Sequence, residues 1–339
     1  MTTINISGNT GSSKIQIGET ISNFRKYLPE GNTIVVTDDR VNELYGKLWQ
    51  EFPSIVIGQG EGNKTIATLN LIIHKLLELN ADRKTFILGI GGGIVCDVAG
   101  FAASVFMRGL KFGFISTTLL SQVDASVGGK NGVNFEDYKN IVGLFNQPEF
   151  VICDPSVLKT LNRSEISNGL AEIVKHALIA DAEMLDYLEQ NISGLLNLDE
   201  NVINHVVTRS VEIKSAMVNL DEKEQGERRK LNFGHTFGHA IEKVAKISHG
   251  NAVSLGMVIA ARYSHERGFL DKSDFDKIIN LLKKLELPVV IDFDNNQILE
   301  ALFKDKKREG SIIHFVLLKK IGQAIVEELP IDVVRKISI

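Results

Sequence analysis

Three histidines and one glutamate are the residues of this sequence best suited to bind a metal. His235 and His239 stand four residues apart in the segment Asn-Phe-Gly-His-Thr-Phe-Gly-His, and His249 follows ten residues later. Histidines at i and i+4 share one face of a helix, and a neutral imidazole is a common Zn²⁺ ligand. Glu172 adds a carboxylate from an earlier segment. Because three protein ligands leave a coordination position open for substrate, we favour a catalytic metal site over unconnected core or surface histidines.

Three consecutive glycines, Gly91 to Gly93, indicate a phosphate-binding turn. They follow a short apolar run and precede a helical pattern, the place where a dinucleotide pyrophosphate meets backbone N–H groups and a positive helix end. The GxGxxG pattern is incomplete, because Cys96 stands in place of the third glycine. The alternative is a tight turn that needs positive φ. Asp97, close to this turn, could cap the helix or hydrogen-bond a cofactor.

Other charged residues are ambiguous when taken singly. Glu172, Lys175 and His176 share a helix face, a spacing that also suits an ordinary i,i+3 ion pair. The turn at 60–65 offers backbone donors, a carboxylate and a lysine, or simply a loop and an N-cap. The segments at 124–130 and 139–140 would each pass for a solvated loop, so only the whole set points to a site.

Alternating strands and helices must position the glycine turn. Short Val/Ile-rich runs at 33–37, 54–57, 85–90 and 111–116 read as strands, and amphipathic stretches at 41–51, 65–79 and 94–106 read as helices. This alternation is typical of βαβ units and a mostly parallel sheet. Residues 4–7 and 14–17 flank a turn and predict an N-terminal hairpin.

The second half has a different pattern. Helical spacing of apolar residues appears at 164–179, 202–220, 234–245, 252–267 and 272–285, which predicts a mainly helical region. With 339 residues, two domains are expected, at 1–160 and 161–339, with the site in the cleft where they meet.

Composition excludes several classes of function. The net charge is −4 without a basic stripe, so no nucleic-acid partner is expected. The apolar stretch at 86–107 contains Asp97 and several glycines, so we interpret it as buried strand, turn and helix and expect no membrane partner. Two cysteines outside any CxxC pair and the lack of a signal-like N-terminus favour a cytoplasmic protein.

The order of the motifs resembles that of the sugar-phosphate cyclases, specifically the 3-dehydroquinate synthase family, over 38–307. The resemblance is carried by Gly-Gly-Gly-Ile-Val-Cys-Asp-Val-Ala-Gly-Phe at 91–101, Met-Arg-Gly at 107–109, Ser-Thr-Thr-Leu-Leu at 116–120, Val-Asp-Ala-Ser-Val-Gly-Gly-Lys at 123–130, Asn-Gly-Leu-Ala-Glu-Ile-Val-Lys at 168–175, the two-histidine motif at 232–239, His-Gly at 249–250 and Asp-Lys-Lys at 305–307. Three positions depart from the family pattern, namely Cys96, Tyr138 and Asn251. They affect local loop geometry and remove no proposed ligand.

The resemblance implies a fold and a set of site residues. The fold is an α/β, Rossmann-like N-terminal NAD domain followed by a mainly α-helical metal- and substrate-binding domain. The implied ligands of a divalent metal, Zn²⁺ or Co²⁺, are Glu172, His235 and His249. The implied NAD⁺ contacts are Asp38, Glu61, Lys64, Gly92, Gly93, Asp97, Thr117, Thr118, Lys130, Lys139 and Thr160. The implied substrate contacts are Arg108, Asp124, Lys130, Asn140, Lys175, Lys214, Arg228 or its neighbour Arg229, Asn232, His239, and Lys306 or Lys307.

The implied activity is that of a phosphate-eliminating lyase of aromatic amino-acid biosynthesis, the shikimate pathway, usually a homodimer. Its substrate is a phosphorylated sugar acid, 3-deoxy-D-arabino-heptulosonate 7-phosphate, and NAD⁺ is recycled in each turnover to yield 3-dehydroquinate and phosphate. Arg and Lys suit such a polyanion. The alternatives are another sugar-phosphate cyclase, a metal-dependent polyol dehydrogenase that releases NADH, and an NAD-binding sensor whose metal is structural.

Overall fold

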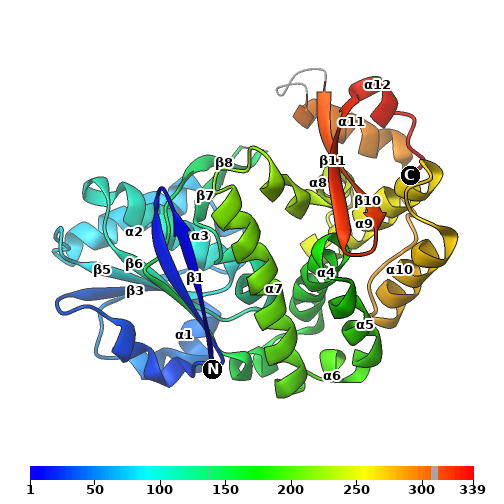
Figure 1. Cartoon of the computed structure of the whole chain (residues 1–339). Helices are drawn as coiled ribbons and strands as arrows, with labels where there is room; N and C mark the ends of the chain where they lie inside the picture. The colour runs from blue at the N-terminus through cyan, green and yellow to red at the C-terminus, as the bar shows by residue number, and fades with distance from the viewer. Residues whose placement is uncertain (137, 307–311) are drawn as a thin grey trace. The chain divides into compact units, whose positions relative to one another are not determined.

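The computed structural model describes residues 1–136, 138–306 and 312–339, the side chains of 304–306 excepted (Figure 1). The chain forms two compact units. One contains residues 1–161 and 214–223, and the other contains residues 162–213 and 224–339. The segment 214–223, which we expected in the C-terminal domain, therefore belongs with the N-terminal residues.

A seven-stranded sheet forms the centre of the first unit, in the order β1-β2-β9-β6-β5-β3-β4. The strands are β1 (Thr2–Gly8), β2 (Gly11–Ile17), β3 (Thr33–Asp38), β4 (Ser54–Ile57), β5 (Phe86–Gly91), β6 (Phe112–Ser116) and β9 (Phe150–Cys153). All pairings are parallel except that of β1 with β2. Every residue of β5 and β6 is buried, as expected where helices cover both faces of a parallel sheet. The predicted α/β fold is confirmed, and its four predicted strands lie within one residue of the observed ones.

Three α-helices accompany this sheet, namely α1 (Asp39–Tyr45), α2 (Ile66–Glu78) and α3 (Gly93–Val105). The single helix predicted at 41–51 is wrong. The chain changes to a 3₁₀ helix at Gly46–Trp49, because glycine is a poor residue for a helix interior and the tighter turn buries Trp49. Trp49 joins an apolar core in which Phe86 stacks on Phe150 with ring centroids 5.8 Å apart.

A second hairpin, β7 (Lys130–Phe135) with β8 (Tyr138–Phe145), was not predicted. Its glycine-rich sequence lacks the alternation that indicates a strand. The glycines instead allow the two strands to approach each other closely, since a Cβ on Gly143 would lie 2.3 Å from the backbone oxygen of Asn131 on the facing strand.

The second unit is mainly helical, as predicted. Its helices are α4 (Arg163–Ala180), α5 (Ala182–Gln190), α6 (Ile192–Leu196), α8 (His235–Ala245), α9 (His249–Glu266), α10 (Lys272–Lys284), α11 (Asn295–Lys306) and α12 (Ile331–Val334), and α7 (Glu200–Leu220) belongs to it as far as residue 213. An antiparallel pair, β10 (Ile312–Lys320) with β11 (Gln323–Pro330), was not predicted.

Close packing of α4, α8 and α9 brings three segments of the second unit together. A Cβ on Gly250 would lie 2.4 Å from the Cα of Asn168, and one on Gly256 would lie 1.9 Å from the backbone oxygen of Gly234. The Gly250 N–H also donates to Asn168 Oδ1 at 2.8 Å. Because these contacts leave no room for a side chain, the first turn of α9 lies directly against α4, and α8 begins beside α9.

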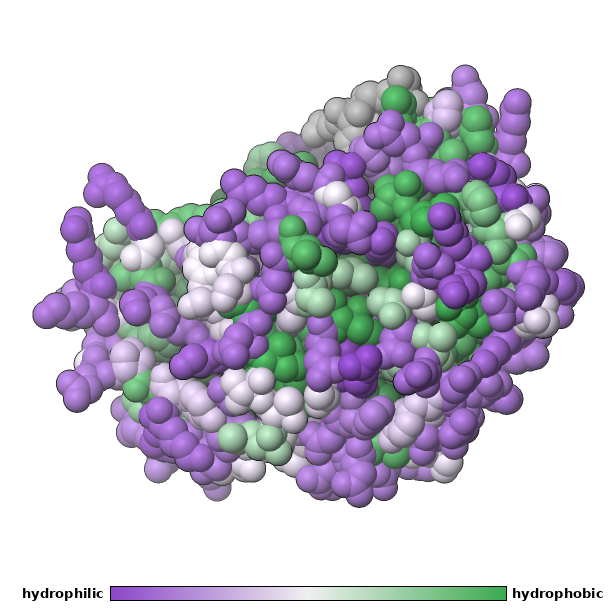
Figure 2. Space-filling view, in the orientation of Figure 1, coloured by the Kyte–Doolittle hydropathy of each residue, from purple (hydrophilic) through white to green (hydrophobic). Residues whose placement is uncertain are grey.

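None of the described helices combines the length and the apolar character that a membrane crossing requires. Hydrophilic residues cover most of the face drawn in Figure 2, with apolar areas between them. Mixed surfaces of this kind are ordinary for folded proteins, whose accessible surface always includes much apolar area.

Candidate active site

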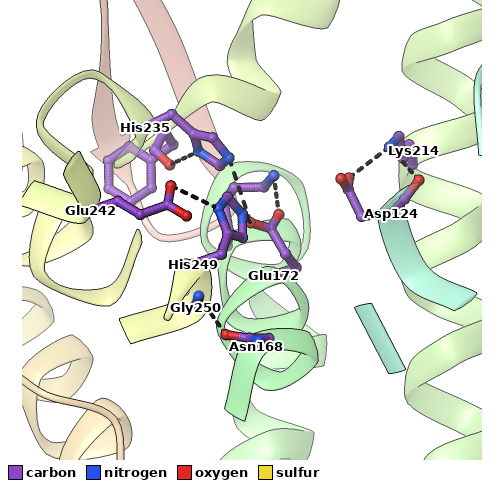
Figure 3. A network of polar contacts seen from close by, with 10 residues as sticks. Asp124, Asn168, Glu172, Lys214, His235, Glu242, His249 and Gly250 are labelled. Carbon is purple, nitrogen blue, oxygen red and sulfur yellow. Dashed lines mark hydrogen bonds and ion pairs between the residues drawn. The ribbon is translucent and has the colours of Figure 1, made fainter. Parts of the chain in front are cut away.

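Glu172, His235 and His249 meet in the second unit, although they come from three different helices (Figure 3). Their potential ligand atoms all lie within 4.8 Å of one another. The Nε2 atoms of His249 and His235 lie 3.3 and 3.5 Å from Glu172 Oε1. Both histidines are the first residues of their helices, α8 and α9, so the close packing described above is what brings them to Glu172 on α4.

The second nitrogen of each imidazole also has a neighbour. His235 Nδ1 lies 3.2 Å from the backbone oxygen of Phe233, and His249 Nδ1 lies 3.6 Å from Glu242 Oε2. Acceptors at Nδ1 favour a proton on that nitrogen, so Nε2 is the nitrogen of each ring that could bind a metal. The two Nε2 atoms converge on Glu172 Oε1.

The electrostatics of this cluster keep the glutamate ionised. Burial by itself raises the pKa of Glu172, but Lys175, His235 and His249 together hold it well below the usual value. Lys175 forms an ion pair with the other carboxylate oxygen, Oε2, and both side chains are almost fully buried. Glu172 is thus an ionised carboxylate at neutral pH.

The two histidines differ in charge in the absence of an ion. Burial, and then the nearby Lys175, hold the pKa of His235 well below its usual value. Burial also opposes the charged form of His249, but contacts with Glu172 and Glu242 outweigh it and raise the pKa to about 9. A divalent cation would replace the proton of His249 and add charge where two carboxylates gather. One ionised carboxylate and two imidazoles are a donor set that suits catalytic zinc, so the residues fit the implied metal.

His239 lies next to this cluster rather than within it. Its ring centroid is 5.2 Å from that of His235 and 6.4 Å from that of His249, and its side chain is exposed. Of the three histidines considered from the sequence, His239 is the one whose nitrogens do not join the group of atoms within 4.8 Å.

The glycine turn lies in the first unit, between β5 and α3. Gly92 is the N-cap of α3, and no side chain caps this helix. None of the three glycines has positive φ, so the tight-turn interpretation is wrong. Their absent side chains serve close packing instead: a Cβ on Gly93 would lie 2.9 Å from Ala125 Cβ, and one on Gly92 would lie 3.0 Å from Thr118 Cγ2. The first turn of α3 has no side-chain cap, as is typical of helix starts whose N–H groups bind phosphate.

Asp97 does not cap α3, so that interpretation is also wrong. It lies one turn inside the helix and forms an ion pair with the buried Lys64. Burial raises the pKa of Asp97 and outweighs the opposing effect of Lys64. Lys64 belongs to the turn at 60–65, which also contains the N-cap of α2: the Thr65 side chain accepts from Thr68 N at 3.2 Å. The turn is therefore a capping loop that also carries a lysine to Asp97.

The remaining predicted NAD⁺ contacts of the first unit take part in local hydrogen bonds. Asp38 accepts from Val41 N at 2.9 Å as the N-cap of α1, and burial raises its pKa. Glu61 accepts from Asn134 Nδ2 at 2.8 Å and lies 3.9 Å from Lys139 Nζ.

Three threonines predicted to contact NAD⁺ also belong to this unit. The Thr117 N–H donates to Gly91 O at 2.9 Å, Thr118 Oγ1 donates to Ser121 Oγ at 3.0 Å, and Thr160 Oγ1 donates to Val157 O at 2.9 Å. Thr117 is thereby joined to the glycine turn itself.

The predicted substrate contacts fall into both units. In the first, Lys214 Nζ donates to the backbone oxygen and to Oδ1 of Asp124, both at 2.7 Å (Figure 3). Arg108 is exposed in a strained turn with φ of 69°, and Lys130 is exposed at the start of β7. Asn140, with φ of 52°, donates its N–H to Asn134 Oδ1 at 2.9 Å.

In the second unit, Lys175 and Arg228 are each 1% exposed, and Asn232 donates its side-chain amide to Glu224. Arg229, the neighbouring alternative to Arg228, instead contacts His314 at 3.0 Å. Lys307 lies outside the described residues, as does the side chain of Lys306.

The sequence analysis did not single out two acidic residues that contact predicted site residues. Glu242 lies beside His249, and Glu224 accepts a hydrogen bond from Asn232. A signal for Glu242 was present, because His235, His239 and Glu242 follow the i, i+4, i+7 spacing of one helix face. Glu224 has no comparable signal, since it lies in a stretch without helical periodicity and has φ of 60°.

Known proteins of the same architecture define the class. The 2-epi-5-epi-valiolone synthase of Streptomyces hygroscopicus subsp. jinggangensis 5008, solved with NAD⁺ and Zn²⁺ bound, has a TM-score of 0.87 and 28% identity, covering 94% of this chain and 92% of that one. A 2-deoxy-scyllo-inosose synthase complexed with carbaglucose-6-phosphate, NAD⁺ and Co²⁺ has a TM-score of 0.88 and 24% identity, covering 99% and 98%. The fold is that of the sugar-phosphate cyclases.

Sequence comparison narrows the class to a family. Family models described as 3-dehydroquinate synthase N-terminal and C-terminal match residues 54–168 and 169–308. The 3-dehydroquinate synthase of Thermoanaerobacter pseudethanolicus (strain ATCC 33223 / 39E) is 40% identical over 321 residues, which are 91% of this chain and 89% of that protein. The chain belongs to the 3-dehydroquinate synthase family.

Proposed function

We propose that this chain is a lyase that converts 3-deoxy-D-arabino-heptulosonate 7-phosphate to 3-dehydroquinate and phosphate, with NAD⁺ recycled in each turnover. The structural observation that best supports the proposal is the convergence of Glu172, His235 and His249. The sequence supports it too, because the chain is 40% identical to a 3-dehydroquinate synthase over most of its length. The product belongs to aromatic amino-acid biosynthesis, the shikimate pathway.

Glu172, His235 and His249 would hold a divalent metal, Zn²⁺ or Co²⁺, and the glycine turn with Asp97 and Lys64 would hold NAD⁺. Once bound, the metal would supply Lewis-acid polarisation of a substrate hydroxyl, and NAD⁺ would supply a hydride acceptor that is regenerated in each turnover. The NAD⁺ and Zn²⁺ bound in the 28%-identical valiolone synthase support this pair of cofactors.

The chain's own residues would bind and orient a polyanion. Lys175 and Arg228 are buried in the second unit, and lysine and arginine side chains match the charge and geometry of phosphate and carboxylate groups. In the first unit, Lys214 is held by Asp124, so its ammonium group is ordered before substrate arrives. His239, exposed beside His235, would relay a proton, because imidazole titrates near neutral pH.

We also propose a homodimer in the cytoplasm. The family resemblance implies the dimer. Cys96 and Cys153 are both free and buried, which suits a reducing compartment.

One experiment separates this function from its rivals. Purified protein loaded with Zn²⁺ and NAD⁺ is given the heptulosonate phosphate while inorganic phosphate and NADH absorbance are followed together. We expect phosphate release without accumulation of NADH, and 3-dehydroquinate as the product. A stoichiometric rise in NADH would show net oxidation, as a polyol dehydrogenase performs, and a different carbocyclic product would indicate another sugar-phosphate cyclase.

A further inference from the structure

Glu242 lies on the same face of α8 as the two histidines of the motif. The spacing His235, His239, Glu242 is i, i+4, i+7, so the three side chains project in one direction. The Glu242 side chain is only 12% exposed, and its Oε2 lies 3.6 Å from His249 Nδ1. Glu172 Oε1 lies 3.3 Å from the other ring nitrogen of His249, so two carboxylates face opposite nitrogens of one imidazole (Figure 3).

The connection between the two helices explains this contact. α8 ends at Ala245, its C-cap Lys246 has a left-handed φ of 53°, and α9 begins at His249. This short turn returns the chain to the last turns of α8, where Glu242 is located. Burying most of a carboxylate is costly unless a partner compensates for the lost hydration, and a positively polarised ring N–H is such a partner.

A histidine ligand needs its proton on the nitrogen that does not face the metal. For His235 the backbone oxygen of Phe233 occupies that position. For His249 the only equivalent contact that the described residues provide is the Glu242 carboxylate. Carboxylates or carbonyls in this position fix the tautomer and orientation of the ring and make it a better ligand.

We propose that Glu242 is a positioning residue for the metal: its carboxylate holds the proton of His249 on Nδ1 and orients the ring, so that Nε2 is directed toward the ion held with Glu172 and His235. This inference rests on the proposed metal site and adds to it a residue that touches neither substrate nor metal.

The test measures metal affinity rather than turnover. Metal-free protein is titrated with Zn²⁺ in competition with a chromophoric chelator, for the wild type and for Glu242→Ala, Glu242→Gln, His249→Ala and Glu266→Gln. The last variant is the matched control, because Glu266 is exposed at the end of α9. Circular dichroism and thermal unfolding of the metal-free proteins establish that each variant is folded.

We expect Glu242→Ala to raise the Kd for Zn²⁺ about 10- to 100-fold, the usual effect of removing such a partner. Glu242→Gln keeps an acceptor without the charge, and a neutral hydrogen bond is roughly half as strong as a charged one, so its Kd should rise about 3- to 10-fold. The visible absorption bands of bound Co²⁺ should shift in Glu242→Ala and stay unchanged in Glu266→Gln.

The outcomes distinguish this inference from the proposed site. A Kd for Glu242→Ala within twofold of the wild type, with binding lost in His249→Ala, would overturn the role of Glu242 and leave the metal site standing. Wild-type affinity in His249→Ala would instead contradict the metal site. Should Glu242→Ala fail to fold, Glu242→Gln decides: a rise in Kd supports the inference, and a Kd within twofold of the wild type overturns it.

Discussion

Each unit of the chain contains a carboxylate in contact with a buried lysine, and the pKa values of the two carboxylates are shifted in opposite directions. In the first unit, burial raises the pKa of Asp97, and Lys64 does not offset it. In the second unit, burial acts on Glu172 in the same sense, yet its pKa falls well below the usual value because Lys175, His235 and His249 surround it. The surroundings of the two carboxylates differ: the nearby carboxylate of Glu61 also raises the pKa of Asp97, whereas Glu172 has Lys175 and two imidazoles beside it.

The difference corresponds to the proposed roles. A carboxylate that is already ionised can bind a cation without first losing a proton, and the partners of Glu172 favour that state. Asp97 lies beside a turn proposed to hold a dinucleotide, where a hydrogen bond to the cofactor is sufficient. Substituting each carboxylate by its amide changes the charge with little change in volume, and so tests the comparison directly.

The largest effect is expected from Glu172→Gln. The amide is a poor metal ligand, so the purified variant should contain little zinc, and kcat should fall about 10³-fold or more, because a Lewis-acid metal contributes several kcal/mol to the barrier. Metal content by mass spectrometry and kcat are the measurements. Glu183→Gln, exposed on α5, is the control for loss of charge. Stoichiometric zinc and unchanged kcat in Glu172→Gln would contradict the assignment.

Asp97→Asn should have a smaller and different effect. Removing the charged partner should weaken NAD⁺ binding about 10- to 100-fold, the equivalent of one charge-assisted hydrogen bond, and zinc content should remain stoichiometric. Calorimetric titration with NAD⁺ and metal analysis of the same sample measure both. If zinc were lost while NAD⁺ affinity was retained, the two carboxylates would have the opposite roles to those proposed.

A third carboxylate, Glu19, sharpens the comparison, because neutral donors lower its pKa more than Lys26 does. Hydrogen bonds from Tyr27, at 2.6 Å, and Asn23 lower the pKa of Glu19 to about 2. The unfolded pKa is higher, so this contribution to stability is complete above about pH 4.5. It is lost as the pH falls through the folded pKa.

Tyr27→Phe removes the strongest of these donors and should have the smallest effect of the three substitutions. We expect the free energy of unfolding to fall by about 1 kcal/mol at pH 7. This loss of stability should disappear as the pH approaches 2. Urea unfolding at several pH values, followed by the fluorescence of Trp49 in the same core, would measure it. Tyr187→Phe in the second unit is the control, and an equal loss at pH 2 and pH 7 would rule out the linkage to Glu19.

The sequence by itself indicated much of the local structure, although it missed the β7–β8 and β10–β11 pairs and the end of α1 at Tyr45. Apolar runs of four to six residues indicated β3, β4, β5 and β6, because strand formation depends on short β-branched segments. Apolar periodicity indicated α2, α3 and the principal helices of the second unit for a similar reason, since the spacing of residues along the chain decides which of them share a face. Composition and motif order were enough to indicate the family, which the comparisons confirmed.

Tertiary structure decided what depends on residues far apart in the chain. The packing of α9 against α4 at Gly250 brought His249 to Glu172, whereas helical spacing alone would have paired His235 with His239. The segment 214–223 belongs with the first unit because Lys214 bonds to Asp124 and Glu222 accepts from the N–H of Asn9 at 2.7 Å. Neither contact has a signature in local sequence, and the same holds for the opposite pKa shifts of Asp97 and Glu172. Burial and the convergence of charges are properties of the folded chain.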